Sequence, residues 1–103
     1  MTPEKRVQNL IMEFLRKLYT AGKPLLYGRR QAGGFSYIVG SADLWACMGG
    51  KHLEIEVKAP GKTMRPMQVK WKMRSEAAGA LHVCVDSLDD FKSFIHENFP
   101  EVF

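Results

Sequence analysis

The spacing of apolar residues predicts a helix at the start of the chain. From Pro3 to Tyr19, apolar side chains recur every three or four positions, which is the pattern of a helix with one buried face. Thr2 is suited to cap this helix and Pro3 to begin it, and Gly22 lies just past its expected end. The next apolar segment, residues 25–27, has the length and composition of a short strand.

Two apolar segments in the middle of the chain, residues 42–48 and 51–58, predict a β-hairpin. They flank Gly49-Gly50, and glycine is favoured in tight two-residue turns because their central positions have positive φ. The register that such a turn sets places Asp43 directly opposite Glu56. The pairing depends on this register, because a slip of one residue would turn every side chain of the strand to the other face.

The rest of the chain predicts a helix, a strand and a final helix. The remaining expected segments, in chain order, are a mobile basic loop at 28–34, an extended segment at 35–39, a loop at 59–61, a helix from Pro66 to Ala78, a buried strand at 80–85 and a helix capped by Ser87. The strand at 80–85 is expected to lie parallel to a hairpin strand through a right-handed crossover. The predicted fold is an α/β sandwich on a mixed sheet, in the order α-β-β-β-α-β-α.

Length and composition are those of one small globular domain, which we assign to residues 1–103. The chain is 46% hydrophobic, and no apolar run reaches the roughly 20 residues that a membrane-spanning helix needs. No secretory signal pattern opens the chain. Cys47 and Cys84 lie in apolar segments without metal-binding spacing, so both are predicted to be buried, reduced thiols of a cytoplasmic protein. Structural roles are predicted for the three histidines: His52, His82 and His96.

Positive charge is concentrated in two segments of the chain. The net charge is +4, with five basic residues and no acid between Glu13 and Asp43, and six basic residues and no acid between Glu56 and Glu76. A basic face of this kind can follow a phosphate backbone. The candidate nucleic-acid contacts are Arg29, Arg30, Lys62, Arg65, Lys70, Lys72 and Arg74. Charge alone also fits a solvated surface or a binding face for an acidic protein. Trp71 fits a core or interface position better than base stacking.

The facing carboxylates of Asp43 and Glu56 are a candidate metal site. Like charges placed opposite each other destabilise a hairpin, and a divalent cation such as Mg²⁺ compensates them by chelation. Lys58 shares the face of Glu56, whereas the alternate side chains of this strand point into the core: Leu53, Ile55 and Val57. The alternative is a solvated hairpin face on which both carboxylates only contact water.

Glu4 is a candidate third carboxylate. At helical spacing it falls within the arc of the apolar side chains of the first helix, and a carboxylate on a buried stripe needs a metal or a basic partner. Glu13 falls on the opposite, polar face. The alternative for Glu4 is a favourable interaction with the helix dipole at an exposed first turn.

The same residues resemble a known nuclease signature. Asp43, then Glu56-Val57-Lys58, then Gln68 is similar to the D…E-x-K…Q pattern of the PD-(D/E)xK nuclease superfamily. The continuation through residues 58–62, Ala78-Gly79 and residues 83–87 resembles the virus-type replication-repair nuclease (VRR-NUC) domains, in particular their small stand-alone phage and bacterial versions. The resemblance covers nearly the whole chain. It departs from the family at Ala42, where a proline often precedes the aspartate.

This resemblance implies a restriction-endonuclease-like sandwich, a central mixed sheet flanked by helices, with a Mg²⁺- or Mn²⁺-dependent site. Asp43 and Glu56 match the metal-binding carboxylates, the Val57 carbonyl a further ligand, Lys58 the catalytic lysine and Gln68 the glutamine that opens the following helix. Glu4, followed by Gln8, matches the glutamate of the first helix.

The implied activity is endonucleolytic hydrolysis of DNA, with preference for Holliday junctions or other branched DNA. The resemblance also implies a role in DNA repair and a homodimer, in the cytoplasm of a bacterial or phage-infected cell. Two other readings remain open: a DNA-binding module that keeps the fold without catalysis, and a protein-interaction domain.

Overall fold

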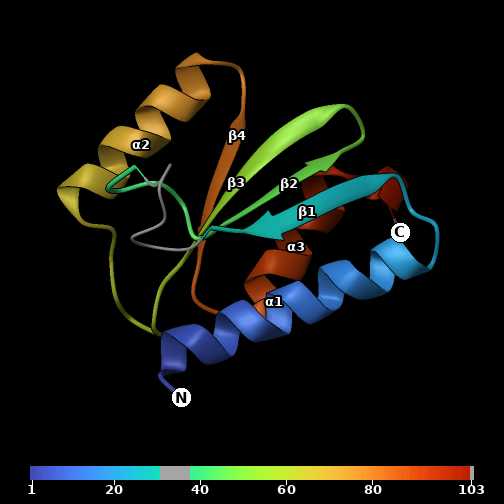
Figure 1. Ribbon diagram of the computed structural model, residues 1–103, viewed down its shortest axis with the longest axis horizontal. Coiled ribbons are helices and arrows are strands. Elements are labelled where there is room, and N and C mark those ends of the chain that lie inside the picture. The colour runs from blue at the N-terminus through green and yellow to red at the C-terminus, as the bar shows by residue number, and fades with distance from the viewer. Residues whose placement is uncertain (31–37, 103) are drawn as a thin grey trace.

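A four-stranded mixed sheet forms the centre of the protein, in a computed structural model that describes residues 1–30 and 38–102. The elements are α1 (Pro3–Thr20), β1 (Leu25–Arg29), β2 (Leu44–Met48), β3 (Lys51–Val57), α2 (Pro66–Ala77), β4 (Leu81–Val85), α3 (Leu88–Asn98) and the 3₁₀ helix η1 (Pro100–Val102). This order of helices and strands confirms the predicted one (Figure 1). The caps are also as predicted, because the Thr2 and Ser87 side chains accept backbone N–H groups at the starts of α1 and α3.

The strands lie side by side in the order β1-β2-β3-β4. The first two pairings are antiparallel, and β4 pairs with β3 in parallel after the chain crosses over through α2. Met48 pairs with Lys51 across a turn whose two residues, Gly49 and Gly50, have φ values of 58° and 81°. The predicted hairpin register is therefore confirmed.

The two faces of the sheet have different covers (Figure 1). Leu53, Ile55 and Val57 of β3 have no exposed surface and pack in one core with apolar residues of α1 and α3. On the opposite face, α2 lies beside β4, and its Trp71 reaches Glu54 of β3. This second face, which we call the open face, carries the alternate residues of β3, including Glu56.

The structure corrects where the first loop begins, and most of that loop and of the next expected segment lies outside the described residues. The loop expected at residues 28–34 begins later, because β1 continues to Arg29. Gly28 belongs to this strand and lies under the Trp45 ring, where a Cβ atom would come within 2.6 Å of Nε1. Residues 31–37, which contain most of the loop and of the extended segment expected at 35–39, lie outside the described residues. Ile38 and Val39, at the end of that segment, are exposed and form no strand.

The prediction of two buried thiols is wrong for Cys84. Cys47 is half-buried, but Cys84 is exposed, and both thiols are free. Strand alternation places Val85 in the core and turns Cys84 to the open face, where it pairs in register with Glu56. Within residues 1–30 and 38–102, no helix has the length and apolar character needed to cross a membrane.

Candidate active site

Asp43 and Glu56 meet at one end of the hairpin. The last paired residues of the ladder are Leu44 and Ile55, and Asp43 immediately precedes β2. Its Oδ2 accepts a hydrogen bond of 3.0 Å from the backbone N–H of Val57. The side chain of Asp43 therefore bends across the end of β3, beside Glu56, as the register predicted.

Glu56 is buried without a hydrogen bond. Its side chain is 1% exposed, and neither carboxylate oxygen has a hydrogen-bond partner among the described residues. The Nζ of Lys58 lies 3.7 Å from Oε1. Burial, followed by the negative charge of Asp43, raises the pKa of Glu56 to about 8. A buried, unsatisfied carboxylate is costly, so the solvated hairpin face is excluded and the site favours a cation or a proton.

Burial also raises the pKa of Asp43, but less than that of Glu56. Burial raises the pKa of its carboxyl group, while the Val57 N–H and the positive charges of Lys58 and Lys5 oppose the rise. Lys58 is itself 8% exposed. The site thus holds one buried carboxylate, Glu56, one half-buried carboxylate, Asp43, and the buried ammonium group of Lys58.

Glu4 lies close enough to influence this pair. It is half-buried in the first turn of α1, and its charge contributes to the raised pKa of Glu56. In the part of the chain that the structure describes, however, no three His, Cys, Asp or Glu side chains are grouped so that they could hold a metal ion. The structure therefore brings Glu4 near the two carboxylates, and its role as a third metal ligand stays a prediction.

Gln68 has a role at the start of α2. Its Oε1 accepts a 2.8 Å hydrogen bond from the backbone N–H of Arg65, which caps the helix. Among the described hydrogen bonds, none joins Gln68 to Lys58. The amide oxygen therefore takes part in the helix cap, while the amide nitrogen can donate to another partner.

The basic residues divide into two groups. Lys62, Arg65, Lys70 and Arg74 are exposed, and Lys72 is half-buried. Arg29 and Arg30 instead turn toward neighbouring elements: Arg29 Nη2 donates to Asn9 Oδ1 at 2.7 Å, and Arg30 forms an ion pair with Glu54.

Glu54 lies next to the candidate site on β3 and was not predicted from the sequence. It is 2% exposed and accepts two hydrogen bonds from Arg30, at 2.7 and 2.8 Å, one of 2.8 Å from Trp71 Nε1, and a further contact from His52. Burial alone would raise its pKa, but the hydrogen bonds from Arg30, His52 and Trp71 lower it below the ordinary value. The alternation His52-Glu54-Glu56-Lys58 along one strand was the available signal, because it places all four side chains on one face.

Arg30 also holds the segment that carries Asp43. Its Nη1 donates to the carbonyl of Ala42 at 3.0 Å, and its backbone N–H donates to the carbonyl of Asp43 at 2.8 Å. Since the same guanidinium is anchored on the buried Glu54, the backbone before β2 is tied to β3. Arg30 and Glu54 thus position Asp43 without entering the carboxylate pair.

Gly40 fixes the other side of this segment. It has a φ of 88°, and a Cβ atom there would come within 2.5 Å of the Met67 carbonyl oxygen in the first turn of α2. The segment leading to Asp43 therefore packs backbone against backbone on α2.

Replacing Gly40 by alanine should destabilise the fold by about 2 kcal/mol or more, since a positive φ costs about 1–2 kcal/mol for a residue with a Cβ atom and the Met67 backbone must also shift. Urea unfolding measures this loss. Gly22→Ala is the matched control, because Gly22 has a φ of 81° but open space around its Cβ position. Equal losses in the two variants would show that the contact with Met67 contributes nothing.

Comparisons with known proteins support the fold. No family model matches the sequence, and no curated protein is significantly similar to it. Two solved structures match over nearly the full length. One, described as a "VRR_NUC domain", is 25% identical, with a TM-score of 0.70 over 96% of this chain and 99% of its own. The other, a "VRR_NUC domain protein", is 16% identical, with a TM-score of 0.77 over 98% of this chain and 91% of its own. The resemblance inferred from sequence is confirmed at the level of structure: over nearly its whole length, this chain has the nuclease-family fold of the VRR_NUC domains.

Proposed function

We propose that this chain is a metal-dependent endonuclease that hydrolyses phosphodiester bonds in DNA. The observation that carries the proposal is the buried carboxylate of Glu56, whose two oxygens lack partners, placed beside Asp43 and Lys58. A nuclease-family fold is the setting in which this arrangement has a chemical use.

The residues present fit a divalent cation. Glu56 offers two free carboxylate oxygens, and Asp43 keeps Oδ1 in addition to the oxygen bound by the Val57 N–H. Oxygen donors of this kind suit Mg²⁺ or Mn²⁺. We assign Asp43, Glu56 and the Val57 carbonyl as ligands, with Glu4 as a further, outer carboxylate. When bound, the ion supplies a Lewis acid and lowers the pKa of a coordinated water.

The chain's own residues supply positioning and charge. The Lys58 ammonium, held 3.7 Å from Glu56, can donate a hydrogen bond to the attacking water or to a phosphate oxygen as negative charge develops. Its burial strengthens this interaction, because water screens it less. We assign to the Gln68 amide nitrogen the positioning of a phosphate oxygen, since its amide oxygen already caps α2.

DNA contacts are assigned to the exposed basic residues that follow β3. Lys62, Arg65, Lys70 and Arg74, with the half-buried Lys72, can contact phosphates and orient the DNA without reading its sequence. Arg29 and Arg30 are poorer candidates, because their guanidinium groups bind Asn9 and Glu54. From the family resemblance we also propose selectivity for branched DNA and assembly as a homodimer.

The test of this function is a cleavage assay. Four-way junction, flap and linear duplex DNA are incubated with the purified protein and Mg²⁺, Mn²⁺ or EDTA. We expect cleavage with either metal and none with EDTA, fastest on branched DNA. Binding without cleavage under every metal condition would favour the non-catalytic DNA-binding module, and absence of binding would favour the protein-interaction domain.

The metal-free protein should become less stable as the pH rises from about 5 to about 9. The folded-state pKa of Glu56 is about 8, whereas an unfolded glutamate titrates near 4.3. The folded state therefore keeps a proton that the unfolded state releases, and stability present at low pH is lost as the pH rises through the folded pKa. The free energy of unfolding should fall by at least about 2 kcal/mol, taking about 1.4 kcal/mol per pKa unit as the scale.

Urea unfolding in EDTA at several pH values measures this decline. His82, whose pKa is lowered by burial, contributes with the opposite sign. Comparison with Glu56→Gln, which keeps His82, isolates the contribution of Glu56. A variant that declines as steeply as the unmodified protein would exclude Glu56 as the titrating group.

A further inference from the structure

A second site lies beside the carboxylate pair, on the same open face of the sheet. A pocket of about 560 Å³ opens between α2 and the sheet, and none of Asp43, Glu56 and Lys58 lines it. Its lining includes Trp71, Ala78, Ala80 and His52, with Lys70 and Arg74 of α2. Its volume is in the range of pockets that hold small organic groups.

The charge that this pocket offers a ligand is positive. Glu54 is an acidic residue of the pocket lining, but both carboxylate oxygens of Glu54 already have partners. These partners are Arg30, Trp71 and His52. Lys70 and Arg74 are exposed. A ligand in this pocket therefore meets apolar walls and basic side chains, which suits an aromatic group attached to an anion.

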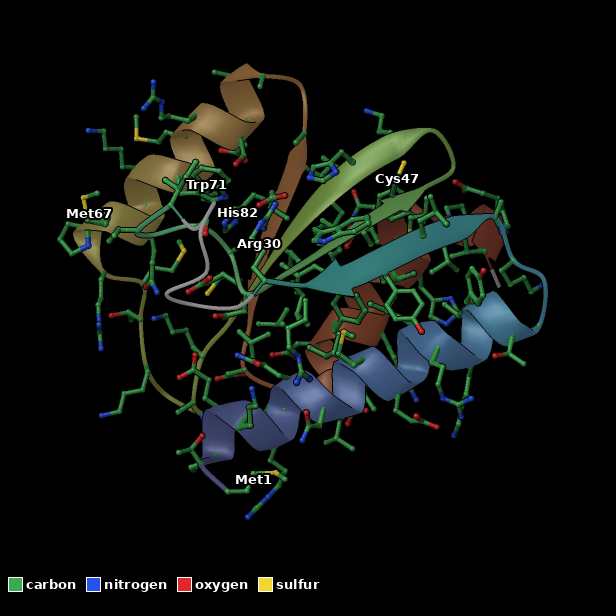
Figure 2. The ribbon with its side chains drawn as sticks, viewed as in Figure 1. Met1, Arg30, Cys47, Met67, Trp71 and His82 are labelled. Atoms are coloured by element: carbon green, nitrogen blue, oxygen red, sulfur yellow. The ribbon has the colours of Figure 1, made fainter. Side chains whose placement is uncertain are left out.

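Trp71 is held in a fixed orientation. Its Nε1 donates to Glu54, and the Arg30 guanidinium lies 5.7 Å from its ring centroid. Figure 2 shows Trp71 reaching from α2 toward the sheet, with Arg30 beside it. A preorganised aromatic side chain loses little entropy on binding, which favours its use as a contact surface.

We propose that this pocket receives an unpaired base of the DNA, next to the phosphate that is cut; the inference rests on the proposed nuclease function. Glu54 of the pocket and Glu56 of the carboxylate pair are two residues apart on β3, a separation of about 7 Å along a strand, which is close to the spacing of neighbouring nucleotides in an extended strand. A base that remains stacked and paired in a duplex does not enter such a pocket. The pocket thus selects DNA with unpaired bases at the cleavage point.

A pocket-filling substitution tests this inference. Ala78→Leu adds side-chain volume to the pocket lining, and Ala77→Leu, at the exposed end of α2 outside the lining, is the matched control. Binding is measured in EDTA, where no cleavage is expected, with single-stranded and fully paired oligonucleotides of equal length. Ala78→Leu should weaken single-strand binding at least about fivefold, since stacking of one base contributes about 1–3 kcal/mol. Duplex binding should change less than about twofold, and Ala77→Leu should change neither.

A second measurement does not depend on that variant. Trp45→Phe leaves Trp71 as the one tryptophan of the chain, and single-stranded DNA should quench its fluorescence whereas duplex DNA should not. Equal effects on both DNA forms, no effect, or a change only in self-association of Ala78→Leu would overturn the proposal. If the protein cuts no DNA but binds single strands through this pocket, the nuclease function is refuted and the pocket is still supported as a binding site for an unpaired base.

Discussion

Replacing Glu56 by glutamine should slow Mg²⁺-dependent DNA cleavage by about a hundredfold to a thousandfold, the usual cost of removing one charge-stabilising group from a reaction centre. The amide keeps the size of the side chain but removes the charge that would hold the cation. The same change should leave the metal-free protein more stable at pH values above about 8, because folding no longer buries a carboxylate without a partner. Single-turnover cleavage rates and urea unfolding measure the two effects.

The opposite signs of these effects distinguish a functional residue from a structural one. A variant that loses activity because it unfolds would lose both, whereas Glu56→Gln should lose activity and gain stability. Glu97→Gln, at an exposed position of α3, is the control and should change neither. If Glu56→Gln retained more than about a tenth of the activity, the carboxylate would not be the metal ligand that the proposal requires.

Local patterns were sufficient to predict most of the fold. The helical spacing of α1, its Thr2 cap and the glycine turn at 49–50 each involve residues near one another in sequence, and the structure contains all three. The end of β1 was missed for a different reason. Gly28 and Arg29 show no apolar alternation, and they join the strand because their backbones pair with Trp45 and Leu44. Such pairing depends on a tertiary neighbour that no local window contains.

The candidate site was predictable in its pairing but not in its burial. Hairpin register alone placed Asp43 beside Glu56. The withdrawal of Glu56 from water depends on the packing of elements distant in sequence, so the sequence could not exclude a solvated face. The link between Arg30 and Glu54 was hidden for the same reason, since Arg30 follows β1 and must reach past β2 to a residue of β3.

Removal of this link should have the largest effect on stability. Arg30→Ala leaves Glu54 buried at 2% exposure without its bidentate partner, and breaking a buried ion pair from one side typically costs about 3–5 kcal/mol. It also removes the hydrogen bond to the Ala42 carbonyl, so the backbone beside Asp43 loses an anchor. Urea unfolding should show the loss, and calorimetric titration with Mn²⁺ should show weaker binding by the variant that remains folded.

An exposed pair of the same chemistry provides the control. Arg16 binds Glu13 through two hydrogen bonds of 2.6 and 2.9 Å, but both side chains are about half exposed, at 54% and 48%. Arg16→Ala should therefore cost little, because water solvates the glutamate that remains. The double variant Arg30→Ala with Glu54→Leu should recover part of the loss of Arg30→Ala alone, since no buried charge is left without a partner. If Arg30→Ala instead cost no more than Arg16→Ala, burial would not be what gives the Arg30–Glu54 pair its importance, and the anchoring of Asp43 would have to come from the backbone pairing and from Gly40.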